Sequence, residues 1–241
     1  MDQETIDDGV NIRVSKPLLS LTSRSKFVYY TLGISLGFEL IMVLMRIVQF
    51  GYVEDYASGD FGALSTIDKM DGYIGLFAIL FIISFIVCAI AVPMWTYRAN
   101  DNLHRGGLGG IKYTSGWAAG WFFVPFANLV VPAKVMGEIE RGTEGLTKEG
   151  TGSGWNAGTS NNAIMWWLFY ILSGVISNVS GKMEETPQDL MNNLRTINFL
   201  EAISLGCALV SAYFLYNMVK NLTKKQEAIM AGEDADELLM E

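Results

Sequence analysis

The sequence predicts an all-α membrane protein with four transmembrane helices and a broken, re-entrant or interfacial helix between the second and the third. Hydrophobic residues make up 51% of the 241 residues and charged residues only 17%, well below the share of roughly a quarter that is typical of soluble domains. The charges gather in short blocks between long apolar runs. This pattern is typical of helical proteins that cross the membrane several times.

Four apolar runs have about the 20 residues that are needed to cross a hydrocarbon core of about 30 Å. We therefore predict an N-terminal segment, a transmembrane domain and an acidic tail. The N-terminal segment has no apolar core or cleavage site typical of a signal peptide, so we expect the first run to act as the insertion signal. The predicted spans cover residues 27–50, 73–97, 163–180 and 197–219, and the three regions cover residues 1–25, 26–220 and 221–241.

The distribution of Lys and Arg predicts the orientation, because cytoplasmic loops carry an excess of these residues. If residues 98–162 stay on one side, thirteen Lys and Arg flank the inner ends of the spans, and only Lys69, Lys182 and Arg195 lie outside. If the middle of that segment crossed the membrane as a fifth span, the division would be nine to seven. We therefore expect a protein of the cytoplasmic membrane with both termini cytoplasmic.

The stretch GWAAGWFFVPFANLVVP, residues 116–132, is apolar enough to enter a bilayer, but Pro125 and Pro132 each remove a backbone donor. Carbonyls freed in this way cannot face lipid. All six tryptophans fall on the inner side in this scheme, where their rings favour the headgroup level. We therefore predict a broken element over residues 114–136 on the cytoplasmic side. A plug of the bundle, a loop that lines a pore or substrate path, and a lipid anchor all remain open.

Three details belong to this prediction. Trp117 and Trp121 are four residues apart and share one helix face. Gly116 and Gly120 have the spacing that allows another helix to approach closely. Asn128 is expected to satisfy backbone groups near the break.

Three ionisable residues lie inside predicted spans, where each costs at least about 2.5 kcal/mol unless it is paired or hydrated. Arg46 is four residues from the outer end of the first span, and Glu201 is four residues from the outer start of the fourth. At about 1.5 Å per residue both lie roughly 6 Å below the outer boundary. We therefore predict an ion pair between Arg46 and Glu201.

The third ionisable residue, Glu39, lies near the middle of the first span without a basic partner at its depth. It is either protonated or accepts hydrogen bonds from Ser35, Ser84 or Ser211. A site that handles protons or cations and a structural hydrogen-bond anchor are the two interpretations.

Small residues predict a compact bundle, because they allow helices to associate in lipid. The first span carries Gly33-x-x-x-Gly37, and the third and fourth carry Ser173, Ser177 and Ser204 at helical spacing. We expect no metal and no cofactor, because His104 is the only histidine and no Cys/His spacing typical of a metal site occurs. The lack of a basic patch with interleaved aromatics argues against nucleic-acid binding.

Two sequence blocks carry a resemblance to a known family. In the first block, an arginine and an asparagine follow a tryptophan, and in the second, paired tryptophans precede the prolines. The positions are Trp95, Tyr97, Arg98, Ala99 and Asn100, then Gly116, Trp117, Gly120, Trp121, Phe122, Pro125, Asn128 and Pro132. Over roughly residues 25–220 the chain resembles a bacterial family of integral membrane proteins catalogued only as a domain of unknown function. The resemblance implies a four-helix membrane domain without an established activity.

The blocks also suggest how the broken element is held. Arg98 and Asn100 follow the second span at the level of the break. We expect Arg98 to donate to carbonyls at Pro125 or Pro132 rather than to a lipid phosphate, and Asn100 and Asn128 to hold the element with it.

Two functions remain in question. The first is a non-enzymatic accessory, assembly or scaffolding subunit that binds a protein partner or itself in the lipid bilayer. The alternative is a small channel or transporter that uses Glu39 and the broken segment 116–132.

Overall fold

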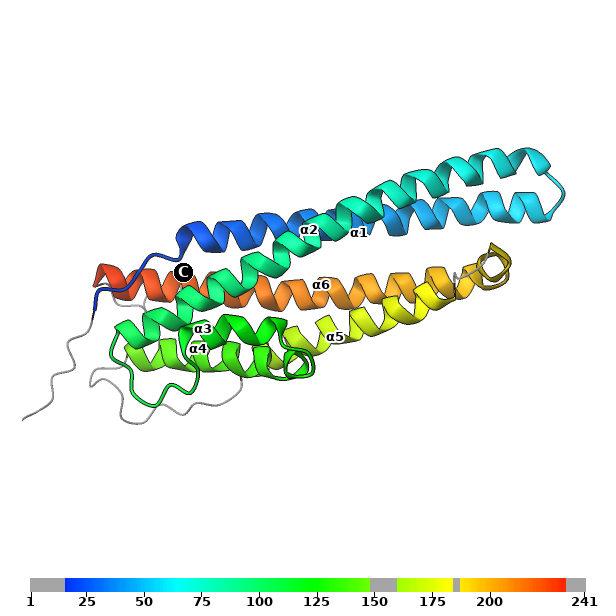
Figure 1. Cartoon of the computed structure of the whole chain (residues 1–241). Coiled ribbons are helices and arrows are strands. Elements are labelled where there is room, and N and C mark those ends of the chain that lie inside the picture. Colours follow the sequence, from blue (N-terminus) through cyan, green and yellow to red (C-terminus); the bar gives the residue numbers. More distant parts are fainter. Residues whose placement is uncertain (1–15, 148–159, 184–186, 233–241) are drawn as a thin grey trace, which may run out of the picture.

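The computed structural model describes residues 16–147, 160–183 and 187–232, and every regular element within these ranges is a helix. Four of the helices are long (Figure 1). They are α1 (Thr22–Ala57), α2 (Leu64–Arg105), α5 (Asn161–Lys182) and α6 (Pro187–Ala231). Between α2 and α5 lie α3 (Ser115–Gly120) and α4 (Val131–Thr147), and three short 3-10 helices complete the set: η1 (Phe61–Ala63), η2 (Trp121–Phe123) and η3 (Ala127–Leu129).

The four long helices are each long and apolar enough to cross a membrane, which confirms the predicted all-α membrane fold. The helices continue beyond the predicted spans. Helices α1, α2 and α6 have 36, 42 and 45 residues, so at about 1.5 Å per residue each exceeds 50 Å and extends beyond a bilayer. Polar residues end the apolar runs without ending the helices, because a helix that leaves the membrane can continue in water.

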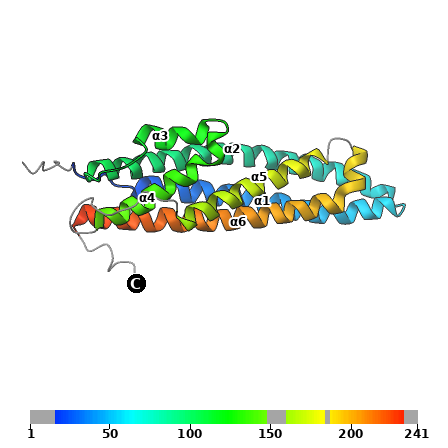
Figure 2. The ribbon, with the colours of Figure 1, turned by 90° about the horizontal axis from the view of Figure 1, so that it is seen from below.

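The long helices form an open row rather than a closed bundle. Helix α1 packs along α2 and α6, and α5 packs along α6, whereas α2 and α5 have few direct contacts (Figures 1 and 2). We call the end where residues 16–21, 98–114 and 220–231 meet the junction end, and the end with the α1–α2 turn the far end. At the junction end, α4 fills the space between α2 and the α5–α6 pair, and α3 packs on the other side of α2 (Figure 2).

The apolar core is concentrated at the junction end. Its fully buried members include Trp95, Leu103, Met136, Ile139 and Val219, which come from α2, α4 and α6. The membrane-spanning windows are much more open: only 17% of the residues in those of α1 and α2 are buried. Two solvents explain the difference, because water drives apolar side chains together whereas lipid does not.

Polar contacts join the spans where apolar burial is sparse. The Ser204 hydroxyl on α6 lies 3.0 Å from the Ser173 hydroxyl and 2.8 Å from the Ser177 hydroxyl on α5. The glycine motif of α1 behaves differently, because a Cβ added at Gly33 or Gly37 would meet no atom within 4 Å. The prediction that this motif packs within a compact bundle was therefore wrong.

Candidate functional site

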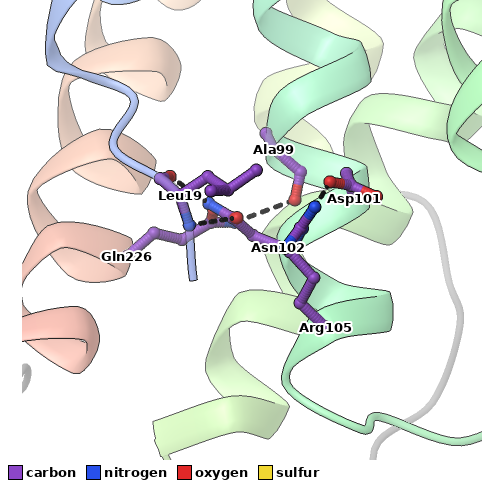
Figure 3. A network of polar contacts seen from close by, with 6 residues as sticks. All are labelled: Leu19, Ala99, Asp101, Asn102, Arg105 and Gln226. Atoms are coloured by element: carbon purple, nitrogen blue, oxygen red, sulfur yellow. Dashed lines mark hydrogen bonds and ion pairs between the residues drawn. The ribbon is translucent and has the colours of Figure 1, made fainter. Parts of the chain in front are cut away.

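The junction end brings together four segments that are far apart in the sequence (Figure 3). The side chain of Asn102 on α2 pairs with the backbone of Leu19: its Oδ1 accepts from the Leu19 N–H at 2.8 Å and its Nδ2 donates to the Leu19 carbonyl at 2.8 Å. The same Nδ2 donates to Oε1 of Gln226 on α6 at 2.8 Å. Asn102 is fully buried. Both of its amide hydrogens and its oxygen are thus used to join three segments.

Gln226 extends the network to α4. Its Nε2 donates to the Ala99 carbonyl at 3.2 Å and to the Thr143 hydroxyl at 2.9 Å, and Thr143 in turn donates to the Ile139 carbonyl at 2.8 Å. Gln226 and Thr143 are both buried. Hydrogen bonds are strong in such a low-dielectric interior, where an unpaired polar group is costly. The buried amides therefore fix the register of α2, α4 and α6.

Glu227 caps the start of α1 from a different helix. The N-cap residue Leu21 makes no side-chain cap, and Glu227 Oε1 accepts instead from the Leu21 and Thr22 N–H groups at 2.6 and 3.0 Å. It also accepts from the Ser20 and Thr22 hydroxyls at 2.7 and 3.0 Å. Partial burial raises the pKa of Glu227, but these hydrogen bonds outweigh it and hold the pKa below its usual value. A carboxylate at a helix N-terminus also complements the helix dipole.

Three tryptophans at the junction end belong to the core. Trp95 is fully buried and donates from Nε1 to the Thr223 hydroxyl at 3.1 Å, and Trp166 and Trp167 are buried as well. Their rings are thus enclosed by protein, and their position at the headgroup level stays a prediction. Trp117 is 55% exposed, and Trp155 lies outside the described residues.

The broken element consists of α3, η2, η3 and α4, and an aromatic cluster on α5 holds its middle. Trp167 Nε1 donates to the Leu129 carbonyl at 3.0 Å, and the Phe122 ring lies 6.3 and 6.0 Å from the rings of Trp166 and Trp167. The predicted shared face of Trp117 and Trp121 is present, with ring centroids 4.8 Å apart.

The turn of the broken element exposes apolar side chains. Phe126 has a φ of 63°, a conformation that is strained for a bulky residue. Its side chain is 86% exposed, and Phe123, Leu129 and Val130 are exposed beside it. Gly116 is open, and Gly120 meets only the Trp117 ring, at 3.5 Å. No other helix therefore packs on this glycine pair.

Glu138 on α4 anchors the loop before α3. Its two carboxylate oxygens accept from the Lys112 and Tyr113 N–H groups at 2.9 and 3.1 Å, and the side chain is only 3% exposed. Burial, followed by the nearby Glu138 carboxylate, raises the pKa of Tyr113. The sequence analysis missed this residue.

The three side chains that were predicted to hold the broken element do not do so by hydrogen bonds. Arg98 Nε is buried without a hydrogen-bond partner, as are both polar atoms of Asn100 and the Oδ1 of Asn128. Within the described residues no hydrogen bond joins Arg98 to Pro125 or Pro132, so that prediction was wrong. Pro132 is buried in the first turn of α4, and Pro125 is exposed.

Arg46, in the first predicted span, takes part in a chain of polar contacts. Arg46 Nη1 donates to Gln49 Oε1 at 3.3 Å, and the buried Gln49 donates to Asp71 Oδ1 on α2 at 2.7 Å. This chain of contacts joins α1 to α2 near the far end. The ion pair between Arg46 and Glu201 stays a prediction.

Glu39 is half-buried and interacts electrostatically with Glu201. The serines that were proposed to donate to it are engaged elsewhere. Ser35 donates to the Thr31 carbonyl and to Ser84, Ser84 to the Phe81 carbonyl, and Ser211 to the Trp166 carbonyl. The interpretation of Glu39 as an anchor held by these serines was therefore wrong.

His104 and the acidic residues were also considered as ligands of a metal ion. His104 Nε2 lies 3.0 Å from the Tyr113 carbonyl and thus contacts the loop before α3. Over the ranges that the structure describes, no three His, Cys, Asp or Glu side chains come close enough together to hold a metal ion.

Asn102 and Gln226 were missed although the sequence carries a signal for them. Asn102 continues the buried stripe of Val92, Trp95 and Ala99, and Gln226 continues that of Leu215, Val219 and Leu222. Steps of three and four residues mark the buried face of a helix. A polar residue on such a stripe indicates a buried hydrogen-bond network. Gln226 was overlooked because residues 221–241 were assigned to an acidic tail.

Comparison with known proteins yields one match. The family described as "Domain of unknown function (DUF4328)" matches residues 57–224, which include the broken element and end two residues before Gln226. No curated protein and no solved structure matches the chain.

We expect Asn102→Asp to unfold the junction. In the wild-type protein Asn102 Nδ2 donates to the Leu19 carbonyl and to Gln226 Oε1. The substitution replaces this donor by a carboxylate oxygen, which cannot donate to either acceptor. The free energy of unfolding should therefore fall by about 3 kcal/mol or more. The control is the neighbouring Asp101→Asn, which removes the partly exposed 2.6 Å ion pair with Arg105 and an electrostatic attraction for Arg24 but no bond of the amide network, and should cost about 1 kcal/mol or less. Unfolding in detergent measures both. Equal losses would contradict the role of the network.

The lowered pKa of Glu227 predicts a pH dependence. A depressed pKa stabilises the folded state above the unfolded value of about 4.3, and this contribution is lost as the pH falls through the folded pKa. The wild-type protein should therefore melt at a higher temperature than Glu227→Gln at pH 7, and the difference should vanish at low pH. Asp68→Asn, on an exposed part of α2, controls for the loss of one acid. A difference that is independent of pH would refute the prediction.

Proposed function

The chain belongs to the family described as Domain of unknown function (DUF4328), and because that description assigns no activity, we propose a function from the geometry. We propose that this is a non-enzymatic protein of the bacterial cytoplasmic membrane that acts by binding. It serves as an accessory, assembly or scaffolding subunit and associates with a second copy of itself through α1. Both termini face the cytoplasm.

The observation that carries this proposal is the open glycine face of α1. Gly33 and Gly37 lie one turn apart with no atom within 4 Å of an added Cβ. Large exposed apolar side chains flank them: Tyr30 is 70% exposed, and Ile34 and Leu44 are each 53% exposed. In lipid, small residues between large ones allow two helix backbones to approach closely. A two-fold axis would bring the same face of each copy together.

The use of polar groups at the junction favours binding over catalysis. The amides of Asn102 and Gln226 and the carboxylates of Glu138 and Glu227 each hold backbone or side-chain groups of another segment. These contacts stabilise the junction end, from which the membrane-spanning helices extend. The excess of Lys and Arg in the connections of the junction end supports its cytoplasmic location.

Cysteine cross-linking tests the self-association. In a chain with Cys88 and Cys207 replaced by Ala, Ile34→Cys should form a disulfide-linked dimer in native membranes, whereas Leu209→Cys, which is exposed on α6, should not. Adding Gly33→Ile and Gly37→Ile should abolish the Ile34→Cys product, because the added side chains separate the backbones.

The mass of the cross-linked product identifies the partner. A product of twice the chain mass supports a second copy. A product of another mass indicates a different subunit, and equal cross-linking at Ile34 and Leu209 would show that the α1 face has no role.

One observation favours a small channel or transporter as the second candidate. Glu39 on α1 and Glu201 on α6 interact within the membrane-spanning part, and intramembrane acids are common in ion and proton pathways. If this function is correct, the protein in liposomes should conduct protons or cations, and Glu39→Gln should reduce the flux at least about tenfold, a change that corresponds to about 1.4 kcal/mol. Glu39→Leu tests for assembly defects. Absent flux, or flux unchanged in Glu39→Gln, would exclude the role.

A further inference from the structure

A groove of about 360 Å³ lies at the junction end of the membrane-spanning part, between α1, α2 and the broken element. Ile90, Pro93 and Met94 of α2 form one wall, and Ala119 and Phe123 form the other. Arg24 on α1 and Tyr97 on α2 complete the lining. The groove is therefore apolar along its length, with one cation and one phenol.

Positive charge gathers around Arg24. Its Nη1 donates to the Met94 carbonyl, and Arg98 and Asp101 both interact with it electrostatically. Asp101 is already paired with Arg105 at 2.6 Å. The Asp101 carboxylate therefore faces Arg105 as well as Arg24, and the guanidinium groups of Arg24 and Arg98 repel each other beside the groove.

One N–H group of Arg98 lacks an acceptor within the described residues. Its Nε is buried without a hydrogen-bond partner, and the proline carbonyls that were expected to receive it do not. A buried guanidinium N–H that donates to nothing costs free energy, so Arg98 is not committed to an acceptor of the chain through this group. An anion from outside the chain, placed between Arg98 and Arg24, would relieve the repulsion of these two like charges.

The depth of the groove is that of a lipid molecule at the membrane surface. Ile90 to Tyr97 are the last residues of the predicted second span, and Arg24 precedes the first. The apolar walls therefore lie at the level of acyl chains and the guanidinium groups at the level of phosphates. Ile90, Met94 and Phe123 are 47%, 43% and 63% exposed, so the groove is accessible from the side.

We propose that this groove binds one anionic phospholipid, with its phosphate between Arg24 and Arg98 and an acyl chain along Ile90, Met94 and Phe123. Guanidinium groups suit phosphate, because they present several donors in a planar fork. Basic sites between transmembrane helices on the cytoplasmic side are suited to acidic lipid headgroups. The apolar walls select a lipid over a free phosphate ion.

The lipid would add contacts between three parts of the molecule, which are α1, α2 and the broken element. Its phosphate would contact α1 and α2, and its chain would contact α2 and the broken element. The exposed turn at Phe123 and Phe126 would thereby be placed against lipid on a fixed side of α2.

The test uses the purified full chain in a neutral detergent. Native mass spectrometry and thermal unfolding compare phosphatidylglycerol with phosphatidylcholine of the same acyl chains, and inorganic phosphate forms a third arm. We expect selective binding of, and stabilisation by, phosphatidylglycerol. Arg24→Gln and Arg98→Gln should each weaken its binding about fivefold, which corresponds to about 1 kcal/mol per basic residue.

Two variants make the outcome decisive. Lys26→Gln removes a charge from the same helix as Arg24 at a similar depth. Lys26 neither lines the groove nor is among the charges that interact with Arg24, so this variant should retain the selectivity. Ala119→Phe keeps both arginines and fills the groove, and should lose the bound lipid. If an arginine variant does not fold, spin-labelled phosphatidylglycerol on the wild-type chain and on Ala119→Phe gives the same comparison.

Three results would overturn the proposal. Equal stabilisation by the two lipids would show that the site does not discriminate between headgroup charges. An equal loss of lipid affinity in Lys26→Gln would show that the arginines act only by nonspecific electrostatic attraction. An equal shift with inorganic phosphate, or undiminished lipid binding in Ala119→Phe, would show that the groove holds no acyl chain.

Discussion

The structure depends on the requirement that the buried amides of Asn102 and Gln226 be fully hydrogen-bonded. Their partners come from the N-terminal segment, α2, α4 and α6, and a shift of any one of these would leave buried donors or acceptors unpaired. Each such group costs about 1–3 kcal/mol. Apolar packing alone would tolerate small changes of register, whereas this network tolerates only one arrangement. The junction therefore sets the positions from which the spans extend.

This arrangement divides the molecule into two parts with different sources of stability. At the junction, apolar side chains pack densely because water drives them together, and the polar network fixes their register. Within the spans, few residues are buried, and contacts such as those of Ser204 with Ser173 and Ser177 join the helices. Because the spans are not required to form a closed core, α1 can leave its glycine face open and α2 can border a groove.

The number of spans could be predicted from the sequence because the thickness of the hydrocarbon core imposes a length on any apolar helix. The ends of the helices could not, since helices continue into water after the apolar run ends. The prolines predicted a break between the second and third long helices, but its contacts were not predicted. Trp166 and Trp167 hold the broken element through Phe122 and Leu129, whereas Arg98 interacts electrostatically with Arg24, because the rotation of α2 about its axis is decided by packing against α4 and α6. Sequence proximity to a proline carries no such information.

The limits of the family match have a structural consequence. Residues 57–224 contain Asn102, Ala99 and Thr143, but the groups that bond to them on Leu19 and Gln226 lie outside the match. The same is true of Glu227 and the start of α1, which bond to each other across the junction. A fragment restricted to the match would leave the buried side chain of Asn102 without its hydrogen-bond partners. The N-terminal segment, α1 and the end of α6 are thus part of the folding unit of this protein, and the contacts of Glu227 hold the start of α1 in place.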